Sequence, residues 1–227
     1  MNAESVMERI AASHAGQASQ MAGGAAWARR RELALARVLG RGLPDRRDEN
    51  WKYLDHAKIA ERAFEILPQR GVSAGQLSAW LLPLHDARRL VMVDGRFEPA
   101  LSDADAGAGV TAEDLATILE TDPTRAFGLV REPGDDADDR YALLADAFAA
   151  EGVVIRVDAG AAPAETLYLL HVCSGSLPGT NHARVVIEIG AGARLLLVEH
   201  FIALGDAPSL SNLAAELRIG ANATVEH

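Results

Sequence analysis

The most constraining feature of the sequence is an imperfect repeat close to its C-terminal end. The segment IGAGARLLLVEH (189–200) is followed by IGANATVEH (219–227). The first residues of the two copies are 219 − 189 = 30 positions apart, and their last histidines are 227 − 200 = 27 positions apart. A repeat of this length is typical of solenoids, in which successive turns stack about 4.8 Å apart. We therefore expect Ile219 to lie on Ile189, with the small residues that follow forming stacked tight corners.

The part of the chain after Glu151 is predicted to contain strands and no helix. Its apolar segments are short, rich in leucine and β-branched residues, and separated by Gly, Pro, Asn and Asp. These segments are GVVIRV, TLYLLHVC, RVVIEI, RLLLVEHF and NLAAELRI. A sandwich, a barrel or a solenoid would fit such a pattern, whereas alternating βαβ units would not. The repeat favours the stacked turns of a β-helix.

The part of the chain before Glu151 is predicted to be largely helical. Apolar residues recur at helical spacing over 25–39, and the Gly and Pro of GRGLP (40–44) end this helix. Ser73 and Gln76 form a capping box before Leu77, Trp80, Leu81 and Leu84, which predicts a second helix from residue 74.

Three further features complete the first half. Thr111 with Asp114 resembles a capping arrangement ahead of an apolar helical pattern, and 139–150 has a helical pattern of its own. Asp94-Gly95 between short apolar runs predicts a β-hairpin. REPGDDADD (131–139) is typical of an exposed loop. We thus expect an α+β protein with a helical region at 1–85, a connecting region with hairpin and helix at 86–150, and the start of a β-helix at 151–227.

Composition excludes several classes of function. Acidic residues number 32 and basic residues 22, so the net charge of −10 argues against nucleic acid or an anionic membrane as the main partner. No apolar run approaches the roughly 20 residues of a membrane span. The single cysteine, Cys173, excludes an intrachain disulfide and fits a reducing compartment such as the cytosol. The first 24 residues resemble neither a signal peptide nor a transit peptide.

The end of the chain at His227 leads to a separate expectation. A terminal turn of a β-helix requires a polar cap or another element laid over it. Because the sequence stops within the second copy of the repeat, we expect a truncated β-helix, with its open end prone to self-association.

Four segments together resemble a known protein family. They are LPDRRDENWKYLD (43–55), RLVMVDGRFEPALSD (89–103), AFAAEGVVIRV (147–157) and VEHFIAL (198–204). They are similar to the SufD scaffold subunits of iron–sulfur cluster assembly, over most of residues 27–227. The resemblance implies an N-terminal helical region followed by a right-handed parallel β-helix. It also implies a non-catalytic scaffold that binds a SufB-like subunit through the β-helix and the ATPase SufC through a C-terminal part missing here. Leu54 stands where the family usually has Thr.

Two groups of residues are candidates for chemistry. His171 and Cys173 are two positions apart on a predicted strand, so they share a face and could both bind a soft metal. A buried free thiol beside a hydrogen-bonded imidazole is the simpler interpretation. Stacking of the repeat would place His227 on His200 and Glu226 on Glu199, most simply on a solvated face.

The remaining motifs favour structural roles. Trp51 and Tyr53 are predicted to anchor their segment to the body of the protein, with Lys52 extending outward. The arginines at 29–31 and 46–47 are too few, and too mixed with acids, to indicate phosphate binding. The chain has neither a P-loop nor a GxSxG motif. We therefore assign no catalytic, cofactor-binding or metal-binding residue, and expect no cofactor in this chain itself.

Alternatives to the scaffold remain open from the residues alone. IGAGAR and IGANAT each resemble one hexad of a hexapeptide-repeat acyltransferase, although such an enzyme requires many hexads in tandem. A generic interaction domain with a β-helical half is a third possibility.

Overall fold

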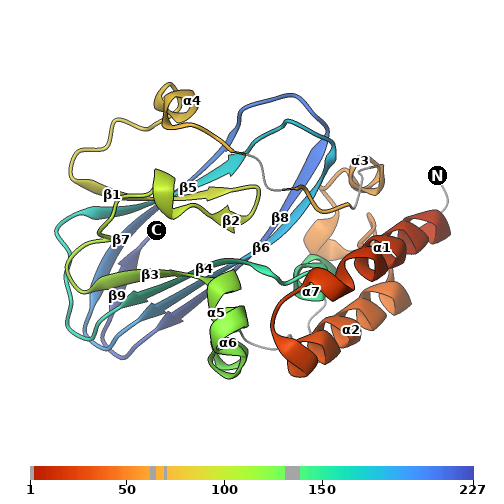
Figure 1. Cartoon of the computed structure of the whole chain (residues 1–227), viewed down its shortest axis with the longest axis horizontal. Helices are drawn as coiled ribbons and strands as arrows, with labels where there is room; N and C mark the ends of the chain where they lie inside the picture. Colours follow the sequence, from red (N-terminus) through yellow and green to blue (C-terminus); the bar gives the residue numbers. More distant parts are fainter. Residues whose placement is uncertain (1–2, 62–64, 69–70, 131–138) are drawn as a thin grey trace.

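The computed structural model describes residues 3–61, 65–68, 71–130 and 139–227, and of residues 3–5 only the backbone. It has the predicted α+β class, with helices packed around two β-sheets (Figure 1). Neither sheet is closed on itself, and each combines parallel with antiparallel pairs.

The helices belong to the first two thirds of the chain. They are α1 (Ala3–Gln17), α2 (Gly24–Arg41), α3 (His56–Ala60), α4 (Ala74–Ser78), α5 (Leu115–Thr121), α6 (Pro123–Leu129) and α7 (Arg140–Ala147). Short 3-10 turns are η1 (Ala18–Gln20), η2 (Glu49–Trp51) and η3 (Pro99–Leu101). From residue 151 onward the chain forms only strands and turns, as predicted.

Nine strands make up the two sheets of the described chain. They are β1 (Ala87–Val93), β2 (Arg96–Phe97), β3 (Val110–Asp114), β4 (Glu151–Val157), β5 (Thr166–Cys173), β6 (Gly179–Ile189), β7 (Arg194–Ala203), β8 (Ser209–Ile219) and β9 (Thr224–Glu226). The order is β2-β1-β5-β7-β9 in the five-stranded sheet and β3-β4-β6-β8 in the four-stranded sheet. Among the strand pairs of the described residues, only β1–β2 and β3–β4 are antiparallel.

The repeat corresponds to the path of the chain through these sheets. From β4 to β9 successive strands alternate between the two sheets, and each strand from β4 to β7 pairs in parallel with the strand two places ahead. Ile189 pairs with Ile219, as expected from their 30-residue separation. Arg194 pairs with Thr224 in the other sheet at the same separation.

The tight corners also stack, and the structure adds a third member that the sequence analysis missed. Gly192 and Asn222 have φ of 70° and 58°, and Gly160 in the preceding corner has φ of 72°. These residue types tolerate the left-handed region. The Gly160 amide donates to the Ala191 carbonyl at 2.9 Å and the Gly192 amide to the Ala221 carbonyl at 2.8 Å. The repeat therefore begins at VDAGA (157–161), where Asp158 replaces the first glycine and hides the likeness.

The main hydrophobic core lies between the two sheets. It contains alternate residues from both, including Leu169, Leu197, Ile155 and Ile187, all at most 1% exposed. Such alternation is what strands with one face inward require. Helices α5 and α6 cover the outer face of the four-stranded sheet at Val154. The outer face of the five-stranded sheet is covered by α4 and the segment after it.

A buried ionic cluster fastens the helical layer to the four-stranded sheet. Asp146 of α7 is fully buried and lies between Arg30 of α2 and Arg184 of β6. The Arg30 Nη2–Asp146 Oδ1 distance is 3.3 Å, and Arg30 also donates to the Val130 carbonyl at 2.7 Å. Buried charges are tolerated only when they are paired in this way. Arg30 of the 29–31 run thus has a structural role.

Several predicted elements are confirmed. Helix α2 contains the predicted 25–39 segment, and Gly42 follows it with a φ of 74°. The hairpin forms at Asp94-Gly95, with Met92 opposite Phe97. Its first strand also pairs in parallel with β5, so the hairpin belongs to the five-stranded sheet. Helix α7 begins after Asp139, whose side chain accepts from the Tyr141 and Ala142 amides.

Other predictions need correction. The Ser73–Gln76 capping box is present, but α4 ends at Ser78. Pro83 disfavours helical backbone at the residue before it, and the segment after α4 runs as irregular chain over the sheet. Thr111 lies within β3, and Asp114 is itself the N-cap of α5. Helix α1 was not predicted, and residues 131–138 of the expected acidic loop lie outside the described residues.

The strand lengths argue against the hexapeptide-repeat interpretation. Strands β5, β6, β7 and β8 have 8, 11, 10 and 11 residues, which exceeds the six residues of one hexad.

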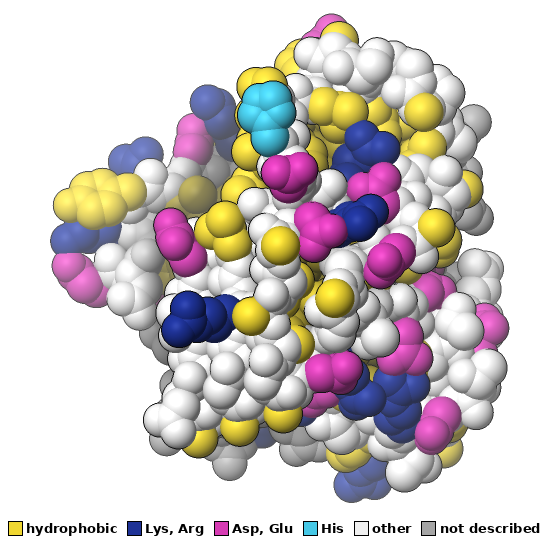
Figure 2. Space-filling view, turned by 90° about the vertical axis from the view of Figure 1, so that its left-hand side faces the viewer, with side chains coloured by type: hydrophobic (Ala, Val, Ile, Leu, Met, Phe, Trp, Pro, Cys, Tyr) yellow, Lys and Arg dark blue, Asp and Glu magenta, His cyan; other side chains and the backbone are white. Residues whose placement is uncertain are grey.

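Figure 2 shows the side of the molecule that lies on the left of Figure 1, where acidic and basic side chains are intermixed. Within the described ranges, none of the helices has both the length and the apolar character needed to cross a bilayer.

Candidate functional site

The cavity beside His171 and Cys173 lies between the two sheets. It measures about 260 Å³ and is lined by both residues and by Phe201 from the five-stranded sheet, with Asn181 and Ser211 from the other. The prediction that His171 and Cys173 share a face is therefore confirmed. The imidazole of His171 stacks on the Phe201 ring at 4.3 Å with a 9° interplanar angle.

A hydrogen-bonded array joins three consecutive strand layers at this position. Glu199 of β7 accepts from His171 of β5 through Oε1, at 2.9 Å from Nε2. Its Oε2 lies 2.8 Å from Nε2 of His227, the residue after β9. The side chains of His171 and Glu199 are 10% and 12% exposed. The hydrogen bond from His171 holds the pKa of Glu199 below its usual range, although burial opposes this shift. A carboxylate held between two imidazoles can store and pass a proton.

The predicted stacking of the two Glu-His pairs is wrong. Glu226 pairs with Leu196, not with Glu199, because the strands keep the 30-residue register of the corners. The segment RLLLVEH is three residues longer than TVEH, so the two histidines end in different positions. The imidazole of His200 instead faces the other side, with Nδ1 2.7 Å from the Tyr168 hydroxyl.

The hypothetical soft-metal site has no third ligand among the described residues. The thiol of Cys173 lies 3.0 Å from Oγ of Ser209. Throughout the described parts of the chain, no three or more His, Cys, Asp or Glu side chains are grouped so that they could hold a metal ion. His171 is hydrogen-bonded, as the simpler interpretation predicted, whereas the free thiol of Cys173 is half-buried and not buried.

The Trp51-Lys52-Tyr53 segment is anchored by only one of its aromatic rings. Trp51 contacts the Tyr141 ring edge to face at 4.8 Å between centroids, as predicted. Tyr53 is 93% exposed, so the prediction that it anchors the segment is wrong. Lys52 extends outward, with Nζ 5.2 Å from the centre of the Tyr53 ring and paired with Glu49.

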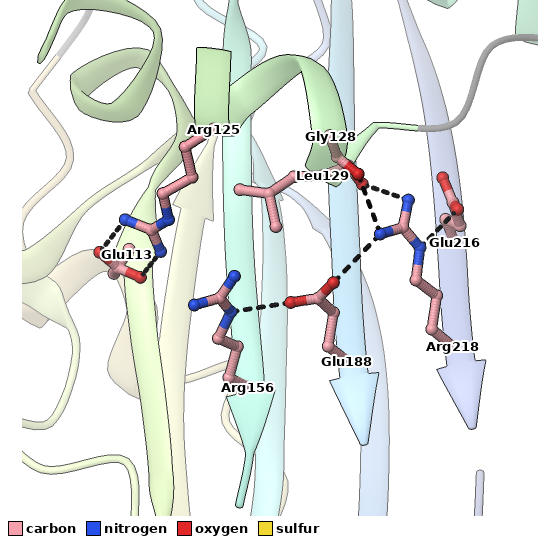
Figure 3. Close-up of polar contacts among 8 residues, drawn as sticks. All are labelled: Glu113, Arg125, Gly128, Leu129, Arg156, Glu188, Glu216 and Arg218. Carbon is pink, nitrogen blue, oxygen red and sulfur yellow. Dashed lines mark hydrogen bonds and ion pairs between the residues drawn. The ribbon is translucent and has the colours of Figure 1, made fainter. Parts of the chain in front are cut away.

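A charged ladder crosses the outer face of the four-stranded sheet (Figure 3). Arg156, Glu188 and Arg218 occupy paired positions on β4, β6 and β8. Glu188 lies 2.7 Å from Nε of Arg156 and 3.1 Å from Nη1 of Arg218. Sequence reasoning missed this ladder, although the separations of 188 − 156 = 32 and 218 − 188 = 30 repeat those of the corners.

The ladder also holds the neighbouring helix. Arg218 donates to the carbonyls of Gly128 and Leu129 at 3.1 and 2.7 Å, at the C-terminal end of α6 (Figure 3). Cations are favourable there because the last carbonyls of a helix lack partners. Glu113 of β3 pairs with Arg125 of the same helix and has its pKa lowered by that hydrogen bond. These contacts give the ladder a structural role at the edge of the helical layer.

The described fold and site define an α+β protein with two strand stacks and an acid–histidine array between them. The iron–sulfur cluster assembly protein SufD of Escherichia coli (strain K12) is 32% identical over 201 residues, covering 85% of this chain and 43% of that protein. An iron–sulfur cluster assembly SufBD family protein of Synechocystis sp. is 20% identical over 195 residues, covering 82% of this chain and 43% of that protein. No family model matches the chain. The chain is SufD-like, and the match spans less than half the length of either relative.

Proposed function

We propose that this chain is part of a SufD-like scaffold of iron–sulfur cluster assembly, without catalytic turnover of its own. The observation that carries the proposal is the match to SufD over 85% of the chain. The described residues add a fold dominated by extended, regularly paired strands, which suits a rigid scaffold. On this proposal the chain has no catalytic, metal-binding or cofactor-binding residue, and it acts in the cytoplasm.

The same proposal includes a specific arrangement of the strands, a right-handed parallel β-helix. Alternation of the strands between two sheets, with parallel partners about 30 residues apart, supports the opening turns of a right-handed parallel β-helix. The β1–β2 hairpin and β3 would then lie at the first turn of that helix. Strands β8 and β9, at the other ends of the two sheets, would offer their free edges to further turns.

The proposed partners are a SufB-like subunit, bound through the β-helix, and the ATPase SufC, bound through a part of the scaffold beyond this chain. A co-purification experiment with SufB and SufC from the same organism tests this assignment. The affinity-tagged 227-residue chain is expected to retain SufB and to lose SufC, while a full-length SufD retains both. Failure of both SufD and this chain to retain SufB would overturn the proposal.

The absence of turnover is tested separately. The purified chain should leave the ATPase rate of SufC unchanged, and should transfer no acetyl group from acetyl-CoA to amine acceptors. Acetyl transfer that disappears in a denatured control would restore the acyltransferase interpretation.

A further inference from the structure

A second cavity, which we call the hairpin cavity, lies where the N-terminal helices meet the two sheets. Its lining includes Gln17 of α1, Arg96 of β2, Glu151 of β4 and His182 of β6. Asp94, at the turn of the β1–β2 hairpin, also lines it. The cavity measures about 120 Å³. One water needs only about 10–15 Å³, so there is room for a molecule of several heavy atoms.

His182 supplies a hydrogen-bond donor to the hairpin cavity. The residue is 3% exposed, and its Nδ1 lies 3.0 Å from the side-chain amide nitrogen of Asn212 on β8. Because that nitrogen is a donor, Nδ1 accepts and the ring hydrogen is on Nε2. Strand β6 lies between β4 and β8, so Nε2 faces the β4 side, where Ala150 also lines the cavity. Nε2 is buried, and none of the described residues accepts a hydrogen bond from it.

Asp94 supplies an acceptor to the same cavity. The residue is 3% exposed, and its Oδ1 accepts from the backbone amide of Ser174 at 2.9 Å. Its Oδ2 is buried and has no hydrogen-bond partner within the described parts of the chain. A buried polar atom without a partner loses its hydration and gains nothing in return. One donor and one acceptor of this kind on the same cavity therefore indicate a polar ligand.

The charge of the lining limits what that ligand can be. Arg96 and Glu151 pair with each other, with Nε 3.1 Å from Oε1. Complete burial lowers the pKa of His182 to about 3, so its ring is neutral near pH 7. The other lining side chains are uncharged, and the carboxylate of Asp94 therefore makes the lining negative overall. This charge repels a carboxylate or phosphate ligand, whereas an ammonium ligand would leave the Nε2 hydrogen of His182 without an acceptor.

We propose that the hairpin cavity binds a small neutral molecule that carries a carbonyl oxygen and an N–H group, of the carboxamide or urea class. The carbonyl oxygen accepts from Nε2 of His182, and the N–H group donates to Oδ2 of Asp94. The bound molecule satisfies both buried atoms and connects the hairpin of one sheet to β6 of the other. The site is independent of the proposed scaffold role, and its test needs no partner protein.

Titration of the intact 227-residue chain with acetamide near pH 7 tests the site. Acetate is the matched probe, because it has the same shape but carries a negative charge and no N–H group. The NMR signals of the His182 ring should shift and saturate as acetamide is added. Acetate should bind at least about tenfold more weakly, because it cannot donate to Asp94 and is repelled by its charge.

The variant Asp94→Asn should reverse this preference. With its oxygen accepting from the Ser174 amide, the new side chain places its nitrogen where Oδ2 lies and turns the acceptor into a donor. Asn also tolerates the left-handed φ of 48° at this position. This variant should therefore bind acetate more tightly than acetamide. Asp103→Asn is the control, because Asp103 accepts from the Arg89 amide at 2.7 Å outside the cavity lining, and it should still prefer acetamide.

A second measurement uses the unaltered chain, in case Asp94→Asn fails to fold. A crystal structure of the chain soaked in acetamide should show the ligand oxygen within hydrogen-bond distance of Nε2 of His182 and the ligand nitrogen within that distance of Oδ2 of Asp94. A cavity that holds only water under these conditions overturns the proposal. Equal affinities for acetamide and acetate also overturn it, as does an Asp94→Asn variant that still prefers acetamide.

Discussion

At the scale of single residues, the packing around His182 of β6 determines the pKa of its imidazole ring. Its ring is 3% exposed and stacks on Phe148 at 4.8 Å with a 14° interplanar angle. The side-chain amide of Asn212 lies 3.0 Å from its Nδ1 and 2.9 Å from the Tyr141 carbonyl. An amide nitrogen that donates to both leaves the ring hydrogen on Nε2. Complete burial lowers the pKa of His182 to about 3.

This shift predicts acid sensitivity of the fold. Because the folded pKa lies below that of the unfolded chain, the neutral ring contributes stability above pH 6.5, and this stability is lost as the pH falls from about 6.5 towards 3. The free energy of unfolding should fall by about 1.4 kcal/mol per pH unit through this group. Urea unfolding of the wild type and of His182→Gln at several pH values measures the difference in slope. His85→Gln, at an exposed position, should retain the wild-type slope; an unchanged slope in His182→Gln would refute the prediction.

Single residues differ in how far the sequence determines their surroundings. The shared face of His171 and Cys173 was predictable, because alternation along a strand is local. The hydrogen bonding of Glu199 to His171 and His227 was not predictable, because these partners lie 28 residues away in the sequence on either side. The prediction that Tyr53 anchors its segment failed because nothing in the WKY sequence shows which of its two aromatic rings contacts Tyr141.

At the scale of elements, the stacked corners have positions with different requirements. A Cβ on Gly190 would lie 2.4 Å from the Ala159 nitrogen, and one on Gly220 would lie 2.7 Å from the Ala191 nitrogen. Asp158 has the equivalent place in the first corner, where the preceding strand, β3, is antiparallel. Gly is therefore needed only where one corner lies directly on another.

Substitution within the corners should separate these requirements. Gly190→Ala should lower the free energy of unfolding by about 1–3 kcal/mol, because backbone atoms of the lower corner must move. Asp158→Ala, its counterpart without a stacked layer, should change stability by less than about 0.5 kcal/mol. Gly192→Asn should be tolerated, since Asn222 already has the same left-handed conformation. Denaturant unfolding of the three variants is the measurement, and equal losses in Gly190→Ala and Asp158→Ala would contradict this account.

Elements with strong local signals were predicted well. Helix α2 and the hairpin each have their own capping or turn residues, and local chemistry determines them. Helix α1 has no such signal, and its Val6 and Ile10 are buried against α2 and α7. Strand β3 is short and carries Glu113 and Asp114, so its pairing with β4 decides its conformation. Tertiary packing overrides weak propensity in both cases.

At the scale of the whole molecule, the period of the repeat predicted the stacking of the strands but not what surrounds them. The 30-residue separation alone implies the Ile189–Ile219 pair. The placement of α5 and α6 depends on Val154 and Val186 as partners, and on Arg218 at the end of α6. Such long-range contacts have no periodic signature within one chain.

The free edges of the two sheets predict association between copies of this chain. Among the described residues, strand β8 pairs only with β6, and on it Leu217 and Ile219 are 37% and 55% exposed. Unpaired edge strands with apolar side chains are templates for further pairing. Sedimentation velocity should therefore show a mass that rises with concentration, and lysine at both positions should reduce this rise. Leu33→Lys is the matched control, because Leu33 is 56% exposed on α2, away from the strands. A wild-type chain that stays monomeric throughout, or a Leu33→Lys variant that loses association equally, would show that the β8 edge is not the surface responsible.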